Sequence, residues 1–132
     1  MPSPRVEILP REKARVYLNR AENLIAAMEA ALLARNPDGV AVTAVQAAIA
    51  FADAYTVLTV QQRSRSPDHR EVVSLISSAR TKDSGQIAGL VQRTLDRKSE
   101  VEYGSRAVRI DDAEDLANSA RNLARLVVGC FD

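Results

Sequence analysis

The chain has 132 residues, of which 46% are hydrophobic and 27% are charged, and its formal net charge is +1. This size and balance predict one soluble globular domain with a substantial core, and the small net charge excludes strong non-specific attraction to nucleic acid or to a membrane surface. The single cysteine, Cys130, excludes an internal disulfide. Residues 1–10 contain no continuous apolar run typical of a signal peptide, so we expect a cytoplasmic protein without a membrane-bound part.

The N-terminal part of the chain is expected to contain a tail and one helix. Residues 1–9 should form an irregular tail, because two prolines interrupt them and Pro10 follows. Residues 10–132 should form a single domain. From Arg11 to Arg35 the apolar side chains recur at intervals of three and four, which predicts an amphipathic helix. The Asn-Pro-Asp-Gly sequence at 36–39 then predicts a stop and a turn.

The next segment is apolar or small at almost every position from Val40 to Val60. A helix that is apolar nearly all round is a buried one, so we expect a central helix that runs to about Gln62. It is too polar and too interrupted for a membrane span. Its polar residues Gln46, Asp53 and Thr56 project within roughly 80° of one another and form a narrow polar strip.

Further helices are predicted in the second half of the chain. Ser66 or Asp68 can cap a third helix. A fourth helix should extend from about Ser84 to Lys98. The mixed-charge segment around Tyr103 has no clear period and is expected to be a loop.

Asp111 or Asp112 is expected to cap the last, alanine-rich helix. Every apolar period found in the sequence is near 3.6 residues and none is near 2. The sequence therefore predicts an all-α fold, an up-and-down bundle of about five helices with a long antiparallel helix pair and no sheet.

Several kinds of functional site are excluded by the sequence. The five glycines are scattered, so there is no glycine-rich phosphate loop. One histidine and one cysteine cannot build a zinc site. No Glu-x-x-His motif is present, which argues against a di-metal carboxylate centre. We therefore expect neither a metal nor a cofactor.

One group of residues could carry chemistry. Arg63, Arg65 and His69 lie in the segment after the central helix, and Asp53 lies on its polar strip. Arginine can hold a phosphate, and histidine can act as an acid or a base near neutral pH. The alternative is structural, with His69 packed against Val72 and its neighbours and the arginines solvated in a turn.

The sequence resembles small bacterial HEPN proteins (higher eukaryotes and prokaryotes nucleotide-binding). The resemblance is carried by AAIAFADAYTV at 47–57, SPDHREVVSLI at 66–76 and KSEVEY at 98–103, followed by the alanine-rich last helix. It implies a helical bundle, a homodimer, and links to nucleotidyltransferases, toxin–antitoxin pairs and RNA cleavage.

Ribonucleases of this family carry an arginine, four to six residues and then a histidine, a spacing that Arg63 and His69 match. Two features depart from that motif. Ser64 replaces the usual Asn, Asp or His, and the match falls in a segment with Pro67 directly after the second helix.

Three functions therefore remain open at the level of the sequence. The first is a non-catalytic HEPN-like dimer that binds a nucleotide, an RNA or a protein partner through Arg63, Arg65, His69 and Asp53. The second is a metal-independent ribonuclease with Arg63 and His69 as catalytic residues. The third is an unrelated helical protein-interaction domain.

Overall fold

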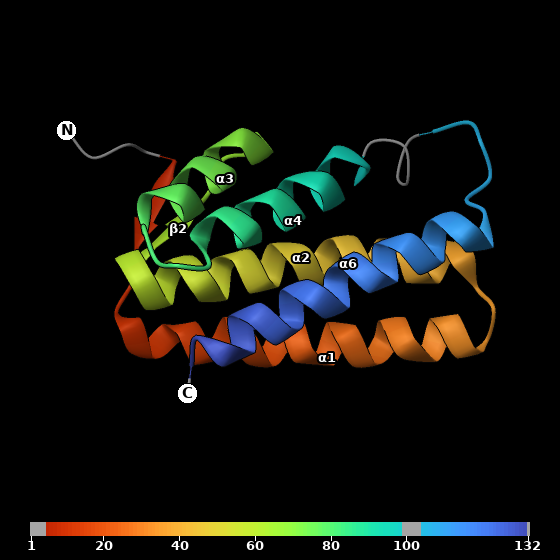
Figure 1. The fold of residues 1–132 in the computed structure, drawn as a ribbon, viewed down its shortest axis with the longest axis horizontal. Coiled ribbons are helices and arrows are strands. Elements are labelled where there is room, and N and C mark those ends of the chain that lie inside the picture. Colours follow the sequence, from red (N-terminus) through yellow and green to blue (C-terminus); the bar gives the residue numbers. More distant parts are fainter. Residues whose placement is uncertain (1–4, 99–103, 132) are drawn as a thin grey trace.

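The computed structural model describes residues 5–98 and 104–131, and this part of the chain is an all-α bundle. Five α-helices are present there, preceded by a 3₁₀ turn at Arg11–Lys13: α1 (Ala14–Leu33), α2 (Pro37–Val60), α3 (His69–Ser78), α4 (Ser84–Asp96) and α6 (Ile110–Gly129). The long helices α1 and α2 lie side by side, α6 crosses them, and α3 and α4 lie on the other side of α2 from α1 (Figure 1). Among the described helices, α2 alone contacts all the others, which confirms the predicted central helix.

The prediction of no sheet is wrong at one place. Residues Val6–Ile8 (β1) pair antiparallel with Gln62–Ser64 (β2), and Glu7 lies opposite Arg63. Strands of three residues are too short to show a period of two, and this pairing is non-local in sequence, so neither strand left a signal. The segment expected to be irregular therefore contains an extended strand that is fixed to the rest of the domain.

The connection between α1 and α2 is tighter than expected. Arg35 adopts a left-handed conformation with φ of 56° and ends the first helix. The Asn36 side chain then caps α2 by accepting a hydrogen bond from the Gly39 N–H at 3.0 Å, and Pro37 occupies the first turn. Residues 37–39 are thus helical and do not form a turn.

The other helix starts agree with the sequence in part. Asp68 caps α3 and accepts a hydrogen bond from the Arg70 N–H at 3.0 Å, as predicted. Arg109, in an extended conformation, precedes α6, so the prediction of an aspartate cap there is wrong by two or three positions. Asp111 and Asp112 lie instead in the first turn, where carboxylates favour the helix dipole. Tyr103 lies outside the described residues.

The core is built on α2. Its buried side chains include Phe51, Tyr55 and Val57, and its alanines allow the neighbouring helices to approach closely. Among the described helices, α2 is also the one long and apolar enough to cross a membrane, but 78% of the relevant window is buried inside the bundle. Burial within the protein thus accounts for its apolar composition.

A cluster of hydroxyl groups fixes the turn between α3 and α4 on α2. The Tyr55 hydroxyl lies 2.7 Å from Thr81 Oγ1 and 2.6 Å from Ser84 Oγ, and Ser84 Oγ accepts a hydrogen bond from the Thr81 N–H at 2.8 Å. Ser84 is the first residue of α4. The cluster therefore determines where α4 begins relative to the central helix.

We expect Tyr55→Phe to lower the free energy of unfolding by about 1–2 kcal/mol, because it leaves two hydroxyl groups in a mostly buried site without their partner. Tyr17→Phe is the matched control, since no described residue hydrogen-bonds to its hydroxyl and the ring contact with Arg63 is kept. Urea denaturation measures both variants. Equal unfolding midpoints for the two would contradict the proposed role of the cluster.

Candidate functional site

The end of α2 determines where the candidate residues lie. Gln61 adopts a left-handed conformation with φ of 55°, which ends the helix and reverses the chain into β2. The reversed strand then runs back beside the last turns of α2. As a result Arg63 lies next to Asp53, ten positions earlier in the sequence.

A cavity of about 250 Å³ opens where β2, the start of α3 and the end of α4 meet on α2. We call it the β2–α3 cavity. It contains all four predicted ligand-binding residues: Arg63, Arg65, His69 and Asp53. The complete described lining is Ile49, Asp53, Arg63, Ser64, Arg65, Ser66, Pro67, His69, Val72, Leu95 and Lys98.

Asp53 and Arg63 form an ion pair in the wall of this cavity. The Arg63 Nε–H donates to Asp53 Oδ2 at 3.1 Å, and Arg63 Nη1 lies 3.5 Å from Glu7 Oε2 on β1. The guanidinium carbon also lies 5.2 Å from the centre of the Tyr17 ring. Arg63 is thus held from three sides, by α2, β1 and α1, and its Nη2 faces no hydrogen-bond acceptor among the described residues.

Asp53 is only 4% exposed. Burial raises the pKa of Asp53 from 3.8 to about 6, although the hydrogen bond and charge of Arg63 oppose that rise. The pairing therefore offsets only part of the cost of burying the carboxylate.

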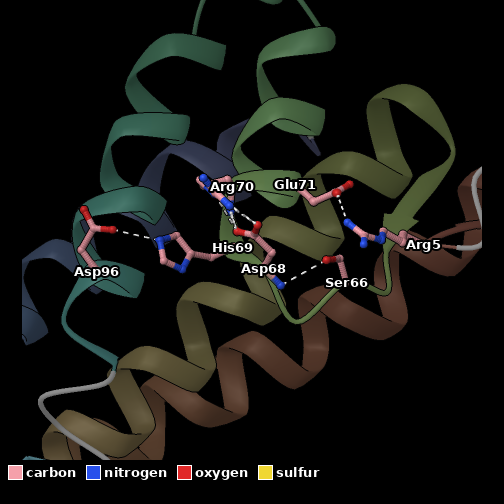
Figure 2. Close-up of polar contacts among 7 residues, drawn as sticks. All are labelled: Arg5, Ser66, Asp68, His69, Arg70, Glu71 and Asp96. Atoms are coloured by element: carbon pink, nitrogen blue, oxygen red, sulfur yellow. Dashed lines mark hydrogen bonds and ion pairs between the residues drawn. The ribbon is translucent and has the colours of Figure 1, made fainter.

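His69 takes a different partner from the one its sequence position suggested. Its ring Nε2 lies 2.9 Å from Asp96 Oδ1 at the end of α4, and its side chain is 37% exposed. Figure 2 shows His69 pointing from the start of α3 toward Asp96, whereas Arg70 folds back onto Asp68. His69 is thus neither buried against Val72 nor unpaired.

Two cations of the cavity are available to a ligand. Arg65 and Lys98 form no ion pair with any residue in the described ranges, and both line the cavity. Around them the backbone is held by two serines: Ser64 Oγ accepts from the Ser66 N–H at 3.3 Å, and Ser66 Oγ accepts from the Asp68 N–H at 3.1 Å. The lining therefore presents three cationic side chains, those of Arg63, Arg65 and Lys98, and one carboxylate, that of Asp53.

The sequence located part of this site. A carboxylate in an apolar helix such as that of Asp53 needs a partner, for which an arginine, a tyrosine hydroxyl or His69 were the candidates, and the structure supplies Arg63. The contributions of Glu7, Tyr17, Asp96 and Lys98 were missed, because they lie on distant elements and carry no local pattern. The rest of the polar strip does not reach the cavity: Gln46 is exposed elsewhere, and Thr56 is buried with its hydroxyl 3.3 Å from the Asp53 carbonyl oxygen. Within the described ranges no group of three or more histidine, cysteine or carboxylate side chains could hold a metal ion.

Comparison of the chain with protein-family models, with curated proteins and with solved structures finds no match. The resemblance to HEPN proteins therefore rests on the sequence segments alone.

The raised pKa of Asp53 predicts a pH dependence. An acid with a higher pKa in the folded state binds more protons there, so its contribution to stability is present below about pH 4 and is lost as the pH rises through about 6. We expect Asp53→Ala to destabilise the protein by about 1–3 kcal/mol at pH 7, because Arg63 loses its buried partner. At pH 5 this penalty should be larger.

Chemical denaturation of wild type and Asp53→Ala between pH 4.5 and 7.5 tests this expectation. Asp115→Ala, which removes an exposed carboxylate from α6, is the control for general charge effects. A difference between wild type and Asp53→Ala that does not change with pH would contradict the assignment.

Proposed function

We propose that this protein is a HEPN-like, non-catalytic binding module whose β2–α3 cavity receives a small phosphate-bearing ligand. The observation that carries the proposal is the composition of the cavity. Arg63, Arg65 and Lys98 line it from β2, the segment after β2 and the segment after α4, and the one carboxylate of the described lining, Asp53, is already paired. Such a set favours an anion.

The volume of the cavity and its lining residues limit the kind of ligand that it can hold. Ile49, Val72 and Leu95 add an apolar part to the lining of the cavity. A volume of about 250 Å³ is near the lower limit for a small-molecule pocket. A phosphate monoester with a compact organic group, such as a mononucleotide, fits both the charge and the volume. His69 is the one aromatic side chain in the described lining, so stacking of successive bases does not support a single-stranded RNA as the ligand.

The existing contacts favour binding over catalysis. Arg63 is engaged through Nε and Nη1, which leaves it able to orient a phosphate through Nη2. These contacts support a fixed receptor for an anion.

The binding proposal predicts that inorganic pyrophosphate and adenosine monophosphate bind wild type and that Arg65→Ala and Lys98→Ala bind each about 10–100-fold more weakly. A hydrogen bond to a charged group contributes about 1.5–3 kcal/mol, which corresponds to that range. Isothermal titration calorimetry at low salt measures the affinities. Arg15→Ala removes the same charge from an arginine that stacks on Phe131 outside the cavity, and it should bind as wild type does. Equal losses in all three variants would point to bulk charge and would contradict a specific cavity.

The second candidate is a metal-independent ribonuclease, and the His69–Asp96 pair favours it. A carboxylate that holds one ring nitrogen fixes the orientation of a histidine, as in catalytic dyads. Arg63, Arg65 and Lys98 could then hold the scissile phosphate in the same cavity.

RNA cleavage by wild type and His69→Ala distinguishes the two candidates, with folding checked by circular dichroism. From the binding proposal we expect no cleavage that depends on His69. Cleavage that is lost in a folded His69→Ala variant would establish the ribonuclease, and equal cleavage by both proteins would indicate a contaminant.

We also propose a homodimer, which the resemblance to HEPN proteins implies. Most residues of α2 are buried within a single chain, so the central helix itself leaves little apolar surface for an interface. A twofold interface would have to use the exposed apolar side chains Ile8, Val16, Leu33 and Val42.

Multi-angle light scattering at micromolar concentration checks this proposal. We expect a mass near twice the 14.4 kDa of the chain. A monomer mass would reject the homodimer and would leave the cavity proposal unchanged.

A further inference from the structure

The strand β2 provides much of the cavity and depends on β1 for its position. Arg63 and Ser64 belong to β2, and Arg65 follows it directly. The strand packs on α2 and α3 along its length, and in the described part of the chain its one strand partner is β1. A change in the docking of β1 would therefore move the residues that face the ligand.

The N-terminal segment is attached to both ends of this strand. At one end the Leu9 N–H donates to the Gln61 carbonyl oxygen at 3.0 Å, and at the other the Arg65 N–H donates to the Arg5 carbonyl oxygen. Antiparallel ladders alternate between hydrogen-bonded and non-hydrogen-bonded pairs. Because the flanking bonds join pairs two residues away on each side, Glu7 and Arg63 are the hydrogen-bonded pair between them.

Side chains add two further links. The Arg5 guanidinium lies 2.7 Å from Glu71 Oε1 on α3, as Figure 2 shows, and the Glu7 carboxylate lies 3.5 Å from Arg63 Nη1. The segment from Arg5 to Leu9 thus bridges the cavity strand and the helix that carries His69.

Few contacts hold β1 on the rest of the domain. β1 has three residues, none of them buried, and Ile8 is 74% exposed, so backbone hydrogen bonds provide most of its contact. A strand held in this way opens at a small cost in free energy. Its docking is therefore sensitive to anything that stabilises the conformation of β2.

We propose that β1 is a strap that positions Arg63 and Arg65, and that docking of β1 and occupation of the β2–α3 cavity stabilise each other. The coupling rests on the proposed function of the cavity. When β1 is docked, the backbone that carries Arg63 and Arg65 is already fixed, so ligand binding does not include the entropic cost of ordering that backbone. Coupling between two binding events is reciprocal, so a bound anion tightens the strap by the same factor by which the strap tightens the anion.

Proline substitutions separate the backbone ladder from other effects. Glu7→Pro removes an N–H from the hydrogen-bonded pair, whereas Ile8→Pro removes one from a non-hydrogen-bonded pair at the next position of the same edge strand. Glu7→Gln removes the carboxylate and keeps the N–H. Inorganic pyrophosphate is the probe, and its affinity is measured by calorimetry on the full chain.

We expect Glu7→Pro to bind pyrophosphate about tenfold more weakly than Glu7→Gln, which has lost the same carboxylate, within the usual range of coupling between sites, and Ile8→Pro to bind within about twofold of wild type. Hydrogen exchange of wild type supplies the reverse measurement. Saturating pyrophosphate should slow exchange of the Leu9 amide, which a purely structural strand would not show. The Gly39 amide, which is bonded to Asn36 at the start of α2, should not change.

The outcomes are distinct. If wild type binds pyrophosphate and Glu7→Pro binds it as tightly as Glu7→Gln, or if Ile8→Pro loses as much as Glu7→Pro, the strap is overturned and the cavity proposal stands. If wild type binds no pyrophosphate and no adenosine monophosphate, the proposed function fails and the coupling fails with it. If Glu7→Pro does not fold, the Leu9 exchange in wild type decides, and an unchanged rate overturns the coupling.

Discussion

The ion pair between Asp53 and Arg63 links the core of this protein to its candidate site. A carboxylate that is 4% exposed on the central helix is costly unless a cation reaches it. The cation can reach it only because the chain reverses at Gln61 and returns along α2 as β2. That return brings Arg65 and the start of α3 to the end of α4, and the β2–α3 cavity lies between them. The position of the cavity is thus a consequence of satisfying one buried charge.

The sequence predicted the helical part of the fold because its apolar periods extend over many turns. The apolar stripe along α1 and the nearly continuous apolar run of α2 each extend over many residues. Single exceptions therefore do not hide the helical pattern. The ribbon of β1 and β2 could not be predicted in the same way. Its stability comes from pairing between Glu7 and Arg63, far apart in the chain, and each strand has only three residues, too few for a sequence pattern to reveal it. The sequence also placed residues 36–39 in a turn, although asparagine followed by proline equally describes a cap followed by a first helical turn.

One contact of the candidate site was predictable, because a buried carboxylate needs a hydrogen-bonding partner. Asp53 was isolated in an apolar helix, so a polar partner was required, and Arg63 was the nearest arginine in the sequence. The sequence did not require a particular partner for His69, because a histidine in the first turn of a helix is satisfied by packing, by water or by a carboxylate. Its partner Asp96 comes from α4, and only the packing of α3 against α4 determines which carboxylate it meets. Lys98 was missed for the same reason.

The contacts of Arg63 bear directly on what the cavity can do. A guanidinium fixed by a carboxylate, a second acid and an aromatic ring has lost most of its rotational freedom before any ligand arrives. It therefore offers its remaining N–H groups in a fixed direction, and little entropy is lost when an anion binds. The same fixation limits its use in catalysis, since stabilising a transition state requires contacts that strengthen as charge develops and Arg63 already shares its charge with Asp53 and Glu7. Arg65 and Lys98 have no such described partners, so their contacts with an anion could strengthen more as charge develops. Under the proposed function, Arg63 would orient an anion through its fixed guanidinium, and Arg65 and Lys98 would contribute mainly attraction.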